Sequence, residues 1–217
     1  MRVLVGCEYS AIVREAFRKR GHYALSCDLD DTDIPGNHYK GDIFDVLDEG
    51  WDLAIFFPPC TYLTTTANRH FLNNPDRWEK RLEAAKFAHS LFNCSIPRIA
   101  MENPKGVLST YIGKPDQIIH PYYFGSSIPK TTCLWLKNLP PLRWSDVNTL
   151  FEKKTSVEPE YLEYNSKRTK SGKSRYSVFG KLGSGHGKER SKFFPEVAEA
   201  MADQWGKLEI LNEAKAS

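Results

Sequence analysis

Two chemically capable side chains follow two apolar segments of the sequence. Cys60 comes after the apolar run 51–57 and two prolines, which end a strand because proline cannot donate to a sheet ladder. Glu102 lies near the end of a second apolar run, 97–104. A thiolate is a strong nucleophile, and a carboxylic acid whose pKa is raised by burial keeps a proton to donate. Together these groups are suited to attack on an electron-poor ring.

Each of the two residues alone has an ordinary structural explanation. Most reduced cysteines are small buried residues, and a single acid after a strand is usually a turn or helix cap. The pair is harder to explain in that way. The carboxyl ends of parallel strands meet at one edge of a sheet, and ligands of open α/β sheets bind there. The pair therefore indicates a reactive site at that edge.

Strands and helices are expected to alternate along the chain. Apolar runs predict strands at 2–6, 22–30, 51–57, 97–104 and 131–137, and periodicity predicts helices at 10–21, 76–93 and 195–208. Ser10 is the predicted cap of the first helix, and Gly21 its stop. The connection 32–47 has room for a short helix. This alternation predicts an α/β fold with a mostly parallel sheet and helices on both faces.

The composition is that of an ordinary globular protein. Of 217 residues, 41% are hydrophobic and 26% are charged, and the net charge is +3. No run approaches the roughly 20 apolar residues of a membrane span, and the amino terminus lacks a signal-peptide layout. The five cysteines have no C-x-x-C spacing, which argues against a disulfide framework and a zinc cluster. We therefore expect a cytoplasmic protein without metal or membrane partners, and the oligomeric state stays open.

The segment 166–192 differs from the rest of the chain. It holds nine lysines or arginines against one glutamate, together with five glycines. This composition predicts a flexible basic loop outside the sheet. Positive charge of this density suits contact with a phosphate backbone, and a solvated surface loop is an equal alternative.

The first strand, its turn and the end of the second strand could hold an adenosine-type cofactor. The turn contains Gly6 but no G-x-G-x-x-G pattern, so an ordinary turn explains it as well. Asp28 ends the second strand at the offset expected of an acid that bonds ribose hydroxyls. Asp42 could bond an adenine amino group. Each acid alone is also explained as a solvated loop residue.

In their order, these segments resemble the DNA cytosine-5 methyltransferase family, most closely its compact members from bacteriophages and prophages. VLVGCEYS resembles the cofactor loop, CDLD the ribose acid, GDI the adenine acid, FPPCTYL the nucleophile loop and MENP the Glu-Asn motif. FGSSIPKTTCLWL resembles a later Gly-x-Pro strand, and FPEVAEAMADQWG the closing helix. The resemblance implies a Rossmann-like S-adenosylmethionine-dependent methyltransferase fold, with DNA as partner.

The resemblance also implies the roles of individual residues. Cys60 would add to carbon 6 of a flipped or single-stranded cytosine, and Glu102 would hydrogen-bond ring nitrogen 3. Carbon 5 would then take a methyl group from S-adenosylmethionine. The implied cofactor residues are Gly6, Cys7, Glu8, Tyr9, Ser10, Asp28, Leu29, Asp42, Ile43 and Pro58. The implied nucleic-acid contacts are Arg69, Lys130, Lys167, Arg168, Lys170, Lys173 and Arg175.

The sequence departs from the family pattern in several places. Glu8, Tyr9 and Ser10 stand where members have glycines, and KTTCL (130–134) stands for Gln-x-Arg-x-Arg. The region before the closing helix is short, so we expect one catalytic domain, 1–217, with 138–192 as a reduced, basic recognition insertion. The segment 64–78 is expected to close over the base; a plain linker is its alternative.

Three functions stay open from the sequence. The first is cytosine-5 methylation of DNA in the cytoplasm, that of the bacterial host if a phage encodes the protein. The second is a degenerate relative that binds DNA or cofactor without turnover. The third is the same chemistry on RNA or on a free pyrimidine nucleotide.

Overall fold

The computed structural model describes residues 1–65, 68, 71, 74–150, 152–165, 173–177 and 192–208. Its elements run in the order β1 (Arg2–Gly6), α1 (Ile12–Arg18), β2 (Tyr23–Asp28), β3 (His38–Lys40), η1 (Ile43–Asp45), β4 (Leu53–Phe56), α2 (Asp76–Phe92) and β5 (Ile99–Pro104). They continue with α3 (Leu108–Ile112), β6 (Gln117–Ile119), η3 (Pro121–Phe124), β7 (Thr132–Lys137), β8 (Leu162–Asn165), β9 (Lys173–Tyr176) and α6 (Pro195–Trp205).

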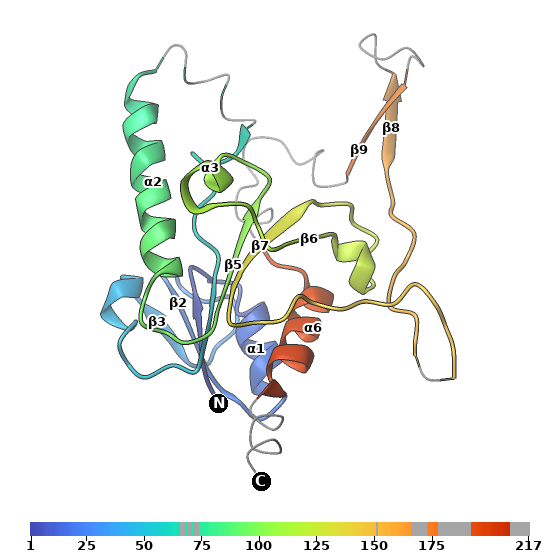
Figure 1. The fold of residues 1–217 in the computed structure, drawn as a ribbon, viewed down its shortest axis with the longest axis horizontal. Coiled ribbons are helices and arrows are strands. Elements are labelled where there is room, and N and C mark those ends of the chain that lie inside the picture. Colours follow the sequence, from blue (N-terminus) through green and yellow to red (C-terminus); the bar gives the residue numbers. More distant parts are fainter. Residues whose placement is uncertain are drawn as a thin grey trace.

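The centre of the molecule is a seven-stranded sheet in the order β3-β2-β1-β4-β5-β7-β6 (Figure 1). The first five strands in this order are parallel, and β7 runs antiparallel to both β5 and β6. One reversed strand between β5 and β6 is the arrangement of Rossmann-like methyltransferases, so the expected fold is confirmed. Because β7 is paired on both sides, it offers no free sheet edge for a second copy.

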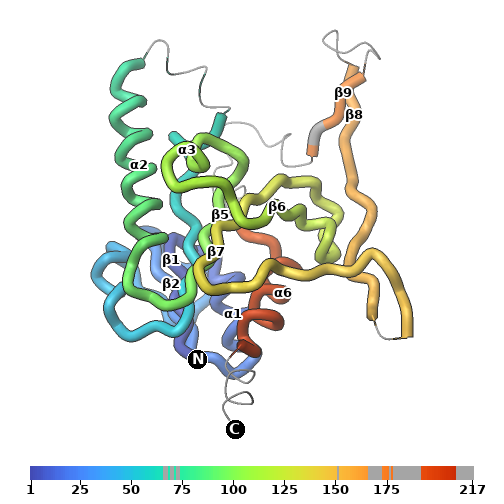
Figure 2. Tube along the Cα trace, in the orientation of Figure 1, coloured from blue at the N-terminus to red at the C-terminus, as the bar shows by residue number. Residues whose placement is uncertain are grey.

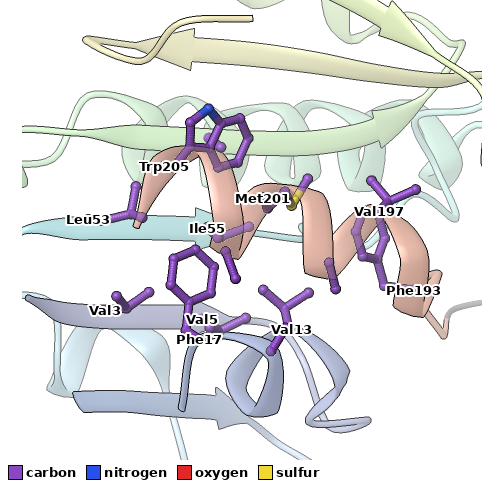
Figure 3. Packing of buried hydrophobic residues seen from close by; sticks show 14 of the residues in the cluster. Val3, Val5, Val13, Phe17, Leu53, Ile55, Phe193, Val197, Met201 and Trp205 are labelled. Carbon is purple, nitrogen blue, oxygen red and sulfur yellow. The ribbon is translucent and has the colours of Figure 1, made fainter. Parts of the chain in front are cut away.

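Helices cover both faces of the sheet, as expected. The helices α1 and α6 lie on one face and α2 on the other (Figure 1). Figure 3 shows the first face, where Val3, Val5, Leu53 and Ile55 of the strands meet Val13, Phe17, Val197, Met201 and Trp205 of the helices. The alternate residues of the strands, such as Leu4 and Phe56, enter the core under α2. Covering both faces explains why these strands read as unbroken apolar runs.

The start of the first helix differs from the prediction. The helix begins at Ile12, and its cap position is Ala11 in the left-handed region (φ 60°) rather than Ser10. The Ser10 hydroxyl still accepts the Ile12 N–H, at 3.4 Å. The Glu8 carboxylate accepts the backbone N–H groups of Val13 and Arg14 instead. A longer acid that reaches forward from the turn thus replaces the usual short capping side chain.

Part of the basic segment forms a hairpin rather than a loop. The strands β8 and β9 pair only with each other and stand away from the main sheet (Figure 2). Lys173 and Arg175 lie on β9, and both form ion pairs with Glu163 of β8, at 3.8 and 3.0 Å. For 173–176 the predicted position outside the main sheet is confirmed, and the predicted loop is wrong. Most of the rest of 166–192 lies outside the described residues. Four predicted contacts lie outside the described residues: Arg69, Lys167, Arg168 and Lys170.

Candidate active site

Cys60 opens a tight turn at the carboxyl edge of the sheet. The backbone N–H of Phe57 still donates to Gly6 of β1 at 3.0 Å, and the two prolines then lead the chain off the sheet. The carbonyl of Cys60 accepts the N–H groups of Leu63 and Thr64, at 3.0 and 3.1 Å. Cys60 is a partly exposed thiol outside any disulfide. The turn holds its backbone while its side chain stays within reach of solvent.

Glu102 reaches the same edge from the neighbouring strand. The register pairs Phe56 of β4 with Met101 of β5, so Glu102 comes one residue after the last paired position. Its side chain is 8% exposed, and its Oε1 is buried without a hydrogen-bond partner among the described residues. Burial raises the pKa of the Glu102 carboxyl, and the nearby charge of Lys130 opposes that shift. A carboxyl with a raised pKa, and with one oxygen that has no hydrogen-bond partner among the described residues, therefore ends the strand next to the Cys60 turn.

Asn103 ties the two strand ends together. Its side-chain Nδ2 donates to the carbonyl of Pro58 at 2.8 Å, and the residue is buried. Pro58 is itself buried, so its contribution to the site is through this carbonyl. This hydrogen bond joins the end of β5 to the loop after β4, and it thereby fixes the Cys60 turn relative to Glu102.

Gly106 provides a second link between the two loops. The N–H of Val107 donates to the carbonyl of Leu63 at 2.8 Å, and Thr64 bridges to Gly106. A Cβ atom at Gly106 would overlap the Leu63 carbonyl oxygen. Only glycine lets these two segments approach so closely.

Replacing Gly106 with alanine is expected to displace Leu63 and with it the Cys60 turn. If the chain has the methyl-transfer activity that the sequence resemblance implies, that activity should fall by about 10- to 100-fold, since a misplacement of about 1 Å has effects of that size. The matched control is Gly21→Ala, where φ is +82° and no atom lies within 4 Å of the added Cβ. Alanine at Gly21 strains the backbone without a clash. Activity assays on both variants below their melting temperatures therefore separate backbone strain from displacement of the Cys60 turn. Equal losses of activity in the two variants would refute a specific role for Gly106.

The segment after Cys60 is anchored on α2. Arg81 is buried, donates to the Tyr62 carbonyl at 2.8 Å and to Asn68 Oδ1 at 2.7 Å, and stacks 3.8 Å from the Phe71 ring. The sequence analysis did not single out Arg81, because an arginine on an amphipathic helix is normally a solvated residue. These contacts hold the described part of the segment 64–78. Its closing over a base stays a prediction.

The turn after β1 adopts left-handed backbone conformations at residues other than glycine. A Cβ on Gly6 would lie 2.7 Å from Phe56 Cδ1 and 2.8 Å from Ile43 Cδ1, so the position requires glycine. Cys7 and Ala11 both adopt left-handed φ values, 59° and 60°. Ile43 is buried beneath this turn. The turn therefore keeps the tight backbone path of a cofactor loop, although the glycines of the family pattern are absent.

Glu8 shapes this turn from the inside. Its Oε1 accepts the Val13 N–H at 2.7 Å and the Ser10 hydroxyl at 3.1 Å, and its Oε2 accepts the Arg14 N–H at 3.4 Å. Burial raises the pKa of Glu8 to about 7, although these hydrogen bonds oppose the shift. Tyr9 and Ser10 are buried as well. The side chains of these three residues face the protein, which leaves the backbone of the turn for a ligand.

Two acids and two exposed apolar side chains lie at the same edge. Asp28 Oδ1 accepts the Asp30 N–H and Asp42 Oδ1 the Phe44 N–H, both at 3.0 Å. Leu29 is 76% exposed and Phe44 is 47% exposed. Carboxylates beside exposed apolar groups suit a ligand with ribose hydroxyls and a flat ring. These residues therefore fit an adenosine-type cofactor.

A groove of about 440 Å³ runs between the Cys60 loop and α2. It is lined by Pro59, Tyr62, Lys80, Glu83, Ala84 and Phe87. Phe87 meets Phe44 edge to face, with ring centroids 5.8 Å apart, so the groove adjoins the turn of Asp42. The sequence analysis missed these two aromatic residues. Phe44 was detectable as the neighbour of the GDI stretch, whereas Phe87 looks like any apolar helix residue.

If S-adenosylmethionine is the cofactor, as the sequence resemblance implies, replacing Leu29 with alanine is expected to weaken its binding by about 10-fold. Stability should change little, because surface changes usually stay within ±0.5 kcal/mol. Calorimetric titration and a thermal melt measure the two quantities. The control is Leu150→Ala, since Leu150 is 92% exposed and lies in the segment 138–192. Unchanged cofactor affinity in the Leu29 variant would remove this residue from the site.

Lys130 lies near Glu102. Its Nζ lies 5.3 Å from the centroid of the Phe194 ring, just before α6, and its charge acts on Glu102. Lys130 is half-buried. It therefore supplies positive charge beside Glu102, where the chain lacks the arginines of the Gln-x-Arg-x-Arg pattern.

The described residues offer neither a metal site nor a membrane-spanning helix. They contain no group of three or more His, Cys, Asp or Glu side chains that could hold a metal ion. They also contain no helix with the length and apolar character needed to cross a membrane.

Comparisons with known proteins give similarity of fold only. No protein-family model matches the chain, and no curated protein matches it. A solved structure of the Entamoeba histolytica methyltransferase EhMeth is 13% identical, with a TM-score of 0.46 over 74% of this chain and 58% of that one. A triple mutant of Spodoptera frugiperda DNMT2 is 17% identical, with a TM-score of 0.38 over 72% of this chain and 57% of that one. This chain spans less than two thirds of either protein, and its function is argued below from the site.

Proposed function

We propose that this protein transfers a methyl group from S-adenosylmethionine to carbon 5 of cytosine in DNA, through a covalent adduct on Cys60. One observation carries the proposal. The buried Glu102 carboxyl has a raised pKa and an oxygen without a partner in the described part of the chain, and Asn103 ties its strand end to the Cys60 turn. A nucleophile and a proton donor on neighbouring strands suit attack on a pyrimidine ring.

The chain's own groups account for activation of the ring. The Cys60 thiolate forms a carbon–sulfur bond at carbon 6, and the electron pair of the ring double bond moves toward carbon 5 and nitrogen 3. Glu102 donates a hydrogen bond to nitrogen 3 and stabilises the charge that develops there. S-adenosylmethionine, when bound, supplies an electrophilic methyl group. Loss of the proton from carbon 5 then lets the carbon–sulfur bond break and releases Cys60.

The proposed cofactor site uses residues in two ways. The half-buried Cys7 follows the buried Gly6 at the turn after β1, and the side chains of Asp28, Leu29 and Asp42 are partly or fully exposed near it. The remaining predicted cofactor residues are buried and shape the site from the protein interior: Glu8, Tyr9, Ser10, Ile43 and Pro58. We infer that these five act through the backbone that they hold.

The proposed partner is DNA, from which the base must leave the stack to reach Cys60. Lys130, Lys173 and Arg175 are the described contacts in this proposal. The remaining proposed contacts lie outside the described residues and are Arg69, Lys167, Arg168 and Lys170. The β8–β9 hairpin projects past the carboxyl edge of the sheet, the end at which the Cys60 turn lies, which supports this role (Figure 1). We therefore propose one catalytic domain, 1–217, of compact phage type, with 138–192 as its recognition insertion.

The test is methyl transfer from radiolabelled S-adenosylmethionine to duplex DNA, single-stranded DNA, RNA and free nucleotides in separate reactions. The expected result is label in DNA that is recovered as 5-methylcytosine. Label in RNA or in nucleotides would keep the chemistry and change the substrate. Absence of label in every reaction, together with absence of cofactor binding, would favour a non-catalytic relative.

A further inference from the structure

Buried polar atoms without partners gather at one end of the β5–β7 ladder. Among the described residues, such atoms include Glu102 Oε1, Asn103 Oδ1 and Thr132 Oγ1. These three residues belong to three successive pairs of the ladder, in which Glu102 faces Leu134, Asn103 faces Cys133 and Pro104 faces Thr132. A buried polar group without a partner costs about 1–3 kcal/mol, so each one needs an explanation. Two of these atoms, Glu102 Oε1 and Thr132 Oγ1, lie on the same face of the sheet, and this pair indicates a ligand site rather than scattered packing defects.

Thr132 shares a sheet face with Glu102. Side chains alternate along a strand, so Glu102 and Pro104 point to one face and Asn103 to the other. Thr132 is the direct partner of Pro104 and therefore shares the face of Glu102. The core agrees with this assignment, since Leu134 and Ile119, the strand partners of Glu102 and Thr132, both pack under α1 and α6. Diagonal side chains of this kind are separated by about 7–8 Å or less, so both can act on one small ring.

The chemistry of the two groups is complementary to the edge of cytosine, an inference that rests on the proposed function. That edge presents an acceptor at ring nitrogen 3, a donor at the 4-amino group and an acceptor at the 2-carbonyl. A protonated carboxyl offers one donor and one acceptor, which match nitrogen 3 and the amino group. The 2-carbonyl then needs a separate donor, and a hydroxyl is one.

We propose that Thr132 is a specificity-determining residue whose hydroxyl donates to the 2-carbonyl of the cytosine held by Glu102. Thr132 is 2% exposed, and its β-branched side chain suits a strand without any ligand. A residue kept only for packing would, however, be improved by valine, which has the same shape and no unpaired hydroxyl. The proposal therefore predicts opposite effects of valine on stability and on activity.

The test compares Thr132→Val with Thr132→Ser. Valine removes the hydroxyl and keeps the shape, whereas serine keeps the hydroxyl and loses a methyl group. Thermal melting of each variant is measured beside methyl transfer to cytosine-containing DNA. We expect the valine variant to melt at or above the wild-type temperature and to lose about 10- to 100-fold in kcat/KM. The serine variant should melt lower and keep activity within about 3-fold of the wild type.

The other outcomes separate this inference from the proposed function. Equal activity of the valine variant and the wild type would overturn the role of Thr132 and leave the proposed function intact. A valine variant that melts lower and loses activity would show a packing role, which also overturns it. A wild-type protein that modifies no cytosine substrate would overturn the proposed function, and this inference with it.

Discussion

The Cys60→Ala variant is expected to bind S-adenosylmethionine and DNA but to transfer no methyl group. Without the thiolate, carbon 6 has no nucleophile and carbon 5 stays unreactive. Activity should fall below about 10⁻³ of the wild type, since loss of a nucleophile can cost up to ~10⁶ in kcat. The folded state should change little, because Cys60 is partly exposed and outside any disulfide.

The matched control for Cys60 is Cys94→Ala. Cys94 is also a partly exposed thiol, but it follows α2 at the opposite edge of the sheet from the Cys60 turn. Its replacement should leave methyl transfer unchanged. Methyl transfer by the Cys60 variant at a rate near that of the wild type would eliminate the covalent mechanism.

The Glu102→Gln variant is expected to lose about 10²- to 10³-fold in kcat, as does removal of one preorganised donor to a developing charge. In the wild type the protonated carboxyl is the active form, so the rate should fall as pH rises through the raised pKa of Glu102. The variant has no proton to lose at this position. Its pH–rate profile should therefore lack that decline, which steady-state rates across a pH series would detect.

The same substitution, Glu102→Gln, should raise the stability of the fold although it lowers activity. Because the pKa of Glu102 is raised in the folded state, its proton stabilises the fold below the ordinary glutamate pKa. That stabilisation is lost as pH rises through the raised value, since ionisation leaves a buried charge. Glu102→Gln should then melt higher than the wild type at pH values above the raised pKa of Glu102. The exposed Glu49→Gln serves as the control, and a lower melting temperature for the Glu102 variant at every pH would contradict the assignment.

Much of the sheet could be predicted from the sequence because its strands are covered on both faces. Runs such as 51–57 are apolar throughout, and prolines or acids mark the edge at which each one ends. The positions of Cys60 and Glu102 on neighbouring strand ends follow from that pattern together with the parallel order. The site was therefore detectable in outline from local signals.

The rest depends on contacts between segments that are distant in the sequence. Nothing local shows that β7 runs antiparallel between β5 and β6, which is what aligns Thr132 with Glu102. Serine often caps helices, which is why Ser10 is the predicted cap. The Glu8 side chain takes that role instead, because Cys7 and Ala11 turn the chain through left-handed conformations. Gly106 looks like any turn glycine until Leu63 is found against it.

The most direct test of the covalent mechanism uses DNA in which the target cytosine carries fluorine at carbon 5. Fluorine cannot leave as a proton does, so the step that releases Cys60 is blocked after methyl transfer. Incubation with S-adenosylmethionine should give a protein–DNA complex that survives denaturant, and peptide mapping should locate the bond at Cys60. Methylation of ordinary cytosine without such a complex, or a complex through another cysteine, would contradict this mechanism.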